Sequence, residues 1–278
     1  ALLAYIRALD AGDIATRHPI LFVGTVDEEG QGDLRGVRHL FTESAYKDRI
    51  GAFFSVDGSN AARVTHGGVG SKRYHVVFAG PGGHSYGAFG IVNPMAAMAR
   101  AVTGLYAIDV PDAPRTTYSA SVTGGGTSVN SIPDSVFVEI DMRSENADAL
   151  ATLEARFLAL VDEAVAHENA ARNTGMGTIS ADPQMIGDRP AGSTPEDAAI
   201  VRRTAAAVRA MGLVPHLNAS STDSNIPMSL GIPAVTIGAG GSGGRAHSPD
   251  EYIIVDAEED VRGQTVGLLA LIAMAEME

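Results

Sequence analysis

The chain has 278 residues, a net charge of −13 at pH 7 and no cysteine. The acidic balance disfavours nucleic acid or an anionic membrane as a general partner, and the lack of cysteine excludes disulfides and thiolate-bound metals. Any metal site must therefore be built from His, Asp and Glu. No apolar run has the length of a membrane span and no secretory signal is present, so we expect a cytoplasmic protein.

The first sixty residues alternate between helix and strand patterns. Apolar residues at helical spacing predict a helix over 1–11, and because no capping residue precedes it, we expect the chain to open inside a helix. Near-continuous apolar runs at 20–26 and 52–56 predict strands buried on both faces, as in parallel sheets. The first run leads directly into Asp27-Glu28-Glu29 and the second into Asp57.

The middle of the chain predicts a small α+β domain. Along 135–143, apolar residues on one face alternate with polar residues on the other, which is typical of an antiparallel sheet covered on one side by helices. The elements follow the split order β-α-β-β-α-β. The predicted strands span 74–79, 116–123, 135–143 and 177–181, and the predicted helices span 93–106 and 147–170.

The remaining residues return to an α/β pattern. A helix is predicted over 193–211, a buried strand over 234–237 and a closing helix over 256–277. The simplest architecture is an α/β domain with a parallel sheet, interrupted by an inserted α+β domain. We place the α/β domain at 1–66 and 187–278, and the inserted domain at 67–186.

Carboxylates follow both early strands, at the sheet edge where ligands of α/β proteins bind. Adjacent carboxylates repel one another unless a cation or shared proton relieves them, so the triplet at 27–29 can combine a metal ligand with a general base. Asp57 and His247 are further candidate ligands, and the set suits zinc, cobalt or manganese. Taken singly, each also fits a solvated turn or a surface histidine.

Three polar residues of the inserted domain are candidates for substrate contact. His84 lies in a glycine-rich loop. Asn130 can donate to a carbonyl, and Arg143 is a natural bidentate partner of a carboxylate. Each also fits an ordinary role, as a loop histidine, a turn residue before a proline or a surface ion-pair residue.

Read in order, these motifs resemble the M20 metallopeptidase family, which includes acetylornithine deacetylase, glutamate carboxypeptidase and tripeptidase. The Val-Asp-Gly variant tilts the resemblance toward the tripeptidase-like branch. The matching segments cover nearly the whole chain: Asp27-Glu28-Glu29-Gly30, Val56-Asp57-Gly58, Gly82-Gly83-His84-Ser85, Asn130-Ser131-Ile132-Pro133, Asp141-Met142-Arg143, Ser221-Thr222-Asp223-Ser224-Asn225 and Ala246-His247-Ser248-Pro249-Asp250-Glu251.

The resemblance implies a phosphorylase/hydrolase-like α/β domain and a ferredoxin-like lid or dimerisation domain at 67–186. It also implies a homodimeric hydrolase with two zinc ions per subunit, acting on a small peptide or an N-acyl amino acid. It implies that Glu28 is the general base, and that Glu29 and His247 bind one zinc while Asp57 binds the second. His84 resembles a lid histidine that reaches the partner's site and stabilises an oxyanion. It further implies that Asn130 and Arg143 hold the substrate, and that Asp223 and Asn225 support the site.

The sequence departs from the family pattern in its metal ligands. The pattern requires a His-x-Asp and a bridging Asp before a helix like that at 1–11, and neither His39 nor His66 has the context to replace them. We therefore expect these 278 residues to begin after the first ligands, and to bind metal poorly and be inactive by themselves. A non-catalytic binding or assembly module is the alternative. A serine hydrolase centred on Ser242 is weaker, because no helix is predicted directly after its G-x-S-x-G motif.

Overall fold

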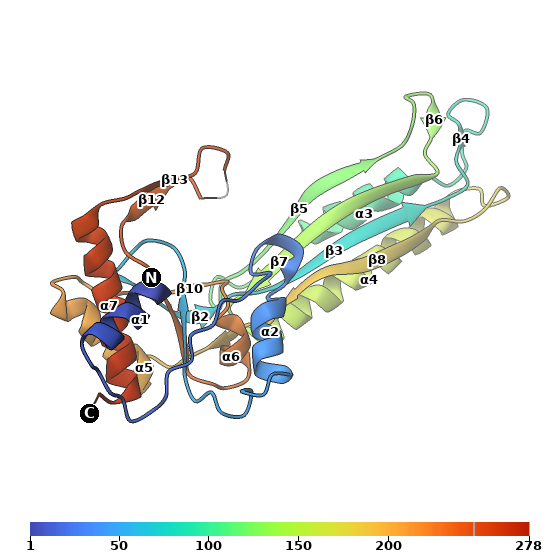
Figure 1. Cartoon of the computed structure of the whole chain (residues 1–278). Helices are drawn as coiled ribbons and strands as arrows, with labels where there is room; N and C mark the ends of the chain where they lie inside the picture. The colour runs from blue at the N-terminus through green and yellow to red at the C-terminus, as the bar shows by residue number, and fades with distance from the viewer. Residues whose placement is uncertain (247, 278) are drawn as a thin grey trace. The chain divides into compact units, whose positions relative to one another are not determined.

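The computed structural model describes residues 1–246 and 248–277 (Figure 1). Contacts divide the chain into two compact units, each of which is described by itself. Unit 1 comprises Ala1–Val69 and Pro190–Glu278, and unit 2 comprises Gly70–Arg189. No helix in the described part of the chain is long and apolar enough to cross a membrane.

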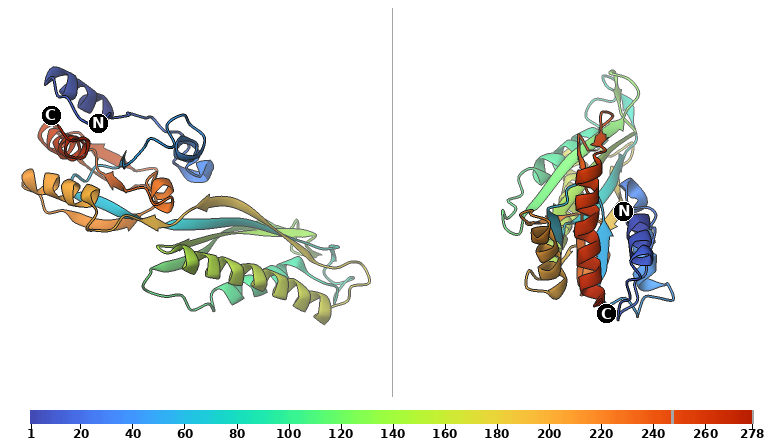
Figure 2. Two further views of the ribbon diagram at one scale, coloured as in Figure 1. Left: turned by 90° about the horizontal axis from the view of Figure 1, so that it is seen from below. Right: turned by 60° about the vertical axis from the view of Figure 1, so that its left-hand side comes forward.

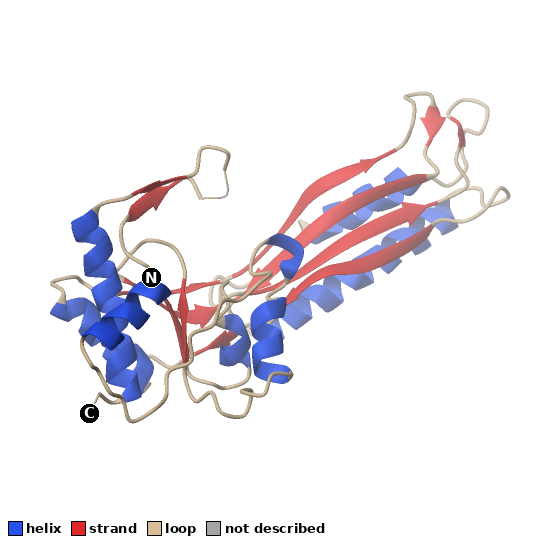
Figure 3. Ribbon diagram, in the orientation of Figure 1, coloured by secondary structure: helices blue, strands red, loops and turns tan. Residues whose placement is uncertain are grey.

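Unit 1 is built on a mixed sheet (Figure 3). The predicted parallel pairing holds for two pairs, β1 with β11 and β2 with β10, whereas β2 runs antiparallel to both β11 and β9. The strands, in their order across the sheet, are β1 (Phe53–Val56), β11 (Ala234–Ile237), β2 (Arg63–Gly68) and β10 (His216–Ser220), with β9 (Gly192–Ser193) on β2.

Two apolar cores hold the helices of unit 1. One joins the sheet to α5 (Ala199–Ala210) and α7 (Ala257–Ala275), and α7 lies between α5 and α1 (Leu2–Ala11) (Figure 2, right). The second core joins α2 (Arg35–Thr42) and α6 (Asn225–Ser229) to Phe53 of β1. The remaining elements of this unit are the 3₁₀ helix η1 (Gly30–Gly32) and the hairpin of β12 (Ser242–Gly244) and β13 (Tyr252–Ile254).

Three predictions for unit 1 are wrong in part. Residues 20–26 form no strand, because none of the described residues pairs with them. The helix predicted from Ser193 begins at Ala199, since Ser193 instead pairs with Gly67 in the sheet. The strands β2 and β10 and the helix α2 escaped prediction, because they are short and carry few apolar residues at regular spacing.

Unit 2 has the predicted order of strands and helices. Its antiparallel sheet runs β5-β7-β3-β8, and α3 and α4 cover one face (Figure 2, left). The last strand begins at Ser180 rather than Gly177 and runs on to Arg189, because at a sheet edge Pro183 and polar residues are tolerated. The elements are β3 (Gly70–Ala79), β4 (Gly83–His84), α3 (Pro94–Leu105), β5 (Thr116–Gly125), β6 (Ser131–Ile132), β7 (Ser135–Ser144), α4 (Ala147–Ala171) and β8 (Ser180–Arg189).

Local sequence explains both helices of unit 2. Asn93 and Asn146 cap them, each accepting a hydrogen bond from a backbone N–H of the first turn, and Pro94 occupies the first turn of α3. The predicted alternation along β7 is confirmed, with its apolar residues buried against the helices. The opposite face carries charged side chains, among them Asp141, which binds both Arg73 and Arg143.

The contact between α1 and α7 depends on one glycine. A Cβ at Gly267 would lie 2.0 Å from Oη of Tyr5, whose ring is buried against α7. Burial raises the pKa of Tyr5 to about 12. A methyl group at position 267 would therefore force the buried Tyr5 ring to shift.

We therefore expect Gly267→Ala to lower the free energy of unfolding by about 1–3 kcal/mol, despite the better helix propensity of alanine. Chemical denaturation measures this effect. Gly51→Ala is the matched control, since a Cβ there meets nothing within 4 Å. Adding Tyr5→Phe to Gly267→Ala should restore part of the loss, and equal stability of Gly267→Ala and the unmodified protein would contradict this packing.

Candidate active site

The acidic segment at 27–29 forms a tight turn that is closed by α2. Asp27 has a left-handed backbone with φ of 62°, and its carboxylate binds Arg35 at 3.1 Å. The backbone oxygen of Asp27 accepts from Leu34 N at 3.0 Å. Gly32 permits this approach, because a Cβ there would lie 2.6 Å from the same oxygen. Glu28 is half-buried, whereas Glu29 is exposed at the start of η1.

Asp57 follows β1 at the carboxyl end of the strand. Its N–H donates to Ile237 O at 2.9 Å, which continues the ladder to β11. Its carboxylate is half-exposed and lies 3.6 Å from Nη2 of Arg63, which also donates to the Asp57 backbone oxygen. The Arg63 charge thus holds this carboxylate in place while solvent still reaches it.

The third predicted ligand, His247, lies outside the described residues. Its neighbours form the loop between β12 and β13, where Arg245 binds Asp250 at 3.3 Å. Within 1–246 and 248–277, no three His, Asp or Glu residues lie close enough to hold a metal ion. The described residues therefore contribute carboxylates with suitable donor chemistry, but they do not make a metal site by themselves.

The segment 221–225 has a structural role that the sequence did not reveal. Nδ2 of the buried Asn225 donates to Val69 O and Pro190 O, both at 2.9 Å, while its Oδ1 accepts from Thr222 N. Val69 and Pro190 are the two residues at which the chain leaves and re-enters unit 1. Asp223 accepts a hydrogen bond of 2.6 Å from Thr25.

Loss of the Asn225 amide would leave three backbone groups without this partner. We expect Asn225→Ala to reduce the free energy of unfolding by about 2–4 kcal/mol, and thermal unfolding measures it. Asn130→Ala is the control, because that side chain is exposed and should change stability by less than about 0.5 kcal/mol. Equal effects of the two substitutions would show that Asn225 does not clamp the two crossings.

In unit 2, His84 and Asn130 lie together on the pair of short strands β4 and β6. His84 pairs with Ser131, and Asn130 O accepts from Ser85 N at 2.9 Å. Nδ1 of His84 accepts from the N–H groups of Tyr86 and Gly87, both at 3.2 Å. In the neutral ring, Nε2 therefore carries the proton and can act as a donor.

Arg143 lies apart from these two residues within unit 2. It is near the end of β7, whereas β4 and β6 lie beyond the start of that strand, next to the Gly80–Asp134 hydrogen bond. At about 3.4 Å per residue, the strand separates them by roughly 27 Å. Nε of Arg143 binds Asp141 at 2.6 Å, which directs the guanidinium and leaves its Nη groups for another anion.

The motif around Ser242 does not form a nucleophile elbow. Ser242 lies in β12, and a loop and β13 follow it rather than a helix. His66, which the sequence also left unassigned, binds Thr194 O at 2.9 Å and supports the sheet.

Comparison with models of protein families shows which family the chain belongs to. The model of peptidase family M20/M25/M40 matches residues 1–273. The chain belongs to this family. Because the chain belongs to this family, it is a hydrolase of amide bonds. The match also confirms the resemblance of its motifs to the M20 family. A comparison with curated proteins found no match.

Solved structures share the fold of this M20 chain. Aminopeptidase PepT from Bacillus cereus is 19% identical with a TM-score of 0.76, and the match covers 98% of this chain and 68% of PepT. A tripeptidase from Staphylococcus aureus is 18% identical with a TM-score of 0.76, covering 98% and 69%. A hydantoinase/carbamoylase family amidase from Burkholderia ambifaria is 18% identical with a TM-score of 0.67, covering 100% and 75%.

Proposed function

We propose that this protein cleaves an amide bond of a small peptide or an N-acyl amino acid with a metal-activated water. The observation that carries the proposal is the family match over 1–273. The donor set adds support, since carboxylates and an imidazole suit zinc, with cobalt and manganese as alternatives. The names of the solved relatives include peptidases and an amidase, so both substrate classes stay within the proposal.

We assign Glu29, Asp57 and His247 as metal ligands and Glu28 as general base. A bound zinc ion would supply a water of lowered pKa. A Glu28 carboxylate oxygen would take the proton of the attacking water and return it to the leaving nitrogen. Glu28 suits this role because it is half-buried beside an exposed neighbour, so the two carboxylates have different environments.

The residues of unit 2 would bind the substrate. Nε2–H of His84 would donate to the developing oxyanion, which its Nδ1 contacts favour by fixing the tautomer. The Asn130 amide would hold the carbonyl, and the Arg143 Nη groups would hold a substrate carboxylate. We further propose that unit 2 acts as a lid and mediates a homodimer, and that the protein works in the cytoplasm.

A substrate panel tests this function. Dipeptides, tripeptides, N-acetyl amino acids and N-carbamoyl amino acids are incubated with the protein, and amine release is measured. We expect hydrolysis of at least one class, its loss with a chelator and its return with zinc. The alternative, a non-catalytic assembly module, predicts no metal-dependent release.

Glu28→Gln separates the general base from the ligands. The amide keeps the size of the side chain but cannot accept the proton, so kcat should fall by about 10²–10⁴-fold. Metal content, measured by elemental analysis, should not change. Unchanged turnover would remove Glu28 from the mechanism, and a large loss of metal would make it a ligand instead.

His84→Ala tests the oxyanion contact. We expect kcat to fall by about 10²–10³-fold with the metal content retained. His167→Ala is the matched control, because His167 is exposed on α4. Steady-state kinetics on both variants measures the difference, and equal activity would exclude the proposed role of His84.

A further inference from the structure

Ser71, in the second position of β3, has a buried hydroxyl without a hydrogen-bond partner. The residue is 1% exposed, and its Oγ makes no hydrogen bond in the described part of the chain. Burial of a hydroxyl without a partner costs free energy, so such a group indicates that a ligand or a water completes it.

The hydroxyl lies between two arginines on the uncovered face of the unit 2 sheet. In the antiparallel ladders Ser71 pairs with Arg143 of β7 on one side and with Arg189 of β8 on the other. Residues directly opposite one another point to the same face, with Cβ atoms about 4.5–5.5 Å apart. This face is opposite α3 and α4, because the alternate residues of β3, which include Tyr74, pack in the helical core (Figure 2, left).

The two arginines cannot supply the acceptor that the serine proton needs. A guanidinium group carries donors alone, whereas a serine hydroxyl both donates and accepts. At this point β3 is paired on both edges, so its backbone oxygens are used in the ladders. The Ser71 proton therefore requires an acceptor from outside the sheet, and a carboxylate oxygen is an acceptor that guanidinium groups also bind well.

Asp141 keeps the Arg143 guanidinium on this face. Its Oδ2 accepts from Nε of Arg143 at 2.6 Å, and its Oδ1 accepts from Nε of Arg73 at 3.0 Å. Arg143 binds Asp141 through Nε, so its Nη groups can donate to a second carboxylate. A guanidinium and a hydroxyl donor are thus held side by side on neighbouring strands.

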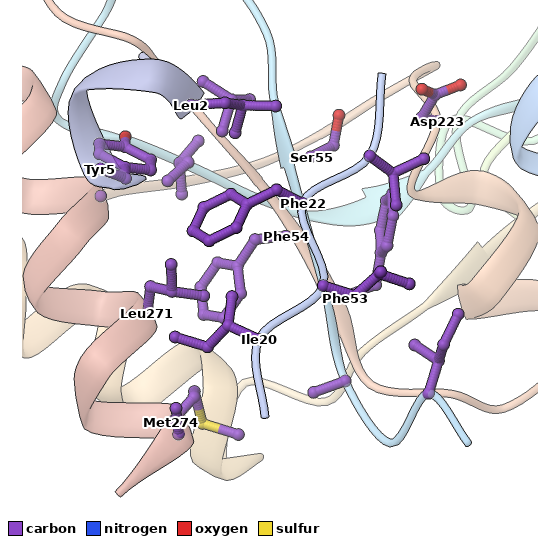
Figure 4. Close-up of a pocket in the computed structure, with 18 of the residues that line it drawn as sticks. Leu2, Tyr5, Ile20, Phe22, Phe53, Phe54, Ser55, Asp223, Leu271 and Met274 are labelled. Carbon is purple, nitrogen blue, oxygen red and sulfur yellow. The ribbon is translucent and has the colours of Figure 1, made fainter. Parts of the chain in front are cut away.

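The groove of about 860 Å³ in unit 1 suits a carboxylate less well (Figure 4). Its lining is mostly apolar, with side chains such as Phe22, Phe54 and Leu271. Ser55 also lines it, but so does Asp223, whose negative charge repels a carboxylate. The uncovered face of unit 2 offers the better chemistry for this group.

We propose that Ser71 is a substrate-binding residue, whose hydroxyl holds the free carboxylate of the substrate together with the Nη groups of Arg143. The inference rests on the proposed function, which assigns Arg143 to the substrate carboxylate, and it adds a second donor to that contact. The hydroxyl donates to one carboxylate oxygen and the guanidinium to the other. A C-terminally amidated analogue lacks the group that both donors bind.

Binding to the metal-free protein tests this role without turnover. N-acetyl-alanine, N-acetyl-leucine and glycyl-alanine are titrated in the presence of a chelator, with their C-terminal amides as matched ligands, and calorimetry measures the affinity. We expect the acids to bind at least about tenfold more tightly than the amides. Absence of binding by all three acids up to about 20 mM would overturn the proposal.

Ser71→Ala separates a ligand-binding hydroxyl from a structural one. The acids should bind about tenfold or more weakly, the loss expected for one hydrogen bond to a charged group, while the amides bind as before. Without ligand, the melting temperature should stay the same or rise, because the variant loses a buried polar group that has no partner. Unchanged binding of the acids would show that a water, rather than the substrate, completes this hydroxyl, and the proposal would fail.

Ser144→Ala is the matched control. Ser144 is 0% exposed at the adjoining position of β7, but its Oγ bonds to Oγ1 of Thr116 at 2.9 Å and accepts from Asn146 N at 3.1 Å. Loss of these bonds should lower the melting temperature and leave the binding of the acids unchanged, which is the reverse of the effect of Ser71→Ala. Arg143→Met should abolish the preference for acids over amides, and a retained preference would contradict the shared site.

This inference and the proposed function fail in different ways. Hydrolysis in the substrate panel, together with unchanged acid binding by Ser71→Ala, would overturn the role of Ser71 and leave the proposed function in place. Acid binding that depends on Ser71, without hydrolysis in the panel, would support the carboxylate site and remove the proposed function.

Discussion

The one-sided hydrogen bonding of β1 is the constraint on which the site of unit 1 depends. Among the described residues, β1 is paired along one edge, and the segment facing its other edge is anchored at both ends without a strand partner. The strand β1 leads into Asp57, and the segment 19–26 leads into Glu28 and Glu29, which are the proposed active-site carboxylates. Because backbone hydrogen bonds hold both segments, they fix where these acids lie.

Polar contacts hold the turn at 221–225, whose Asp223 accepts a hydrogen bond from Thr25. Asn225 binds the backbone at both crossings of unit 1, and a Cβ at Gly68 would lie 3.0 Å from its side chain. Buried hydroxyls of Thr222, Ser224 and Thr236 bond to one another below it. A buried hydroxyl that loses its hydrogen-bond partner costs free energy. The network therefore favours one arrangement of the turn that carries Asp223.

Much of the secondary structure followed from local patterns, because the relevant information is local. Asn93 with Pro94 marks the start of α3, and the alternation along β7 is visible without knowing what covers it. The pairing of strands, in contrast, depends on residues far away in the sequence. The apolar run at 20–26 predicts a strand, and this prediction is wrong, because a ladder needs a neighbour and none of the described residues provides one.

In the candidate site, too, local motifs are visible in the sequence whereas contacts between distant residues are not. The motifs predict roles for the acidic residues, His84, Asn130 and Arg143, since each lies in a recognisable segment, and these roles stay predictions. The ion pairs of Asp27 with Arg35 and Asp57 with Arg63 were not foreseen, because charge alone does not tell which partner is near. The role of Asn225 was also hidden, since its partners are backbone oxygens 35 and 156 residues away.

Hydrogen exchange of the amides of β1 tests the central claim most directly. The claim is that one edge of this strand is bonded to β11 and that the other edge has no strand partner among the described residues. In the 278-residue chain alone, the account predicts slow exchange at Phe53 and Ser55 and much faster exchange at Phe54 and Val56. Uniformly slow exchange along the whole of β1 would show that both edges are already paired and would contradict the account.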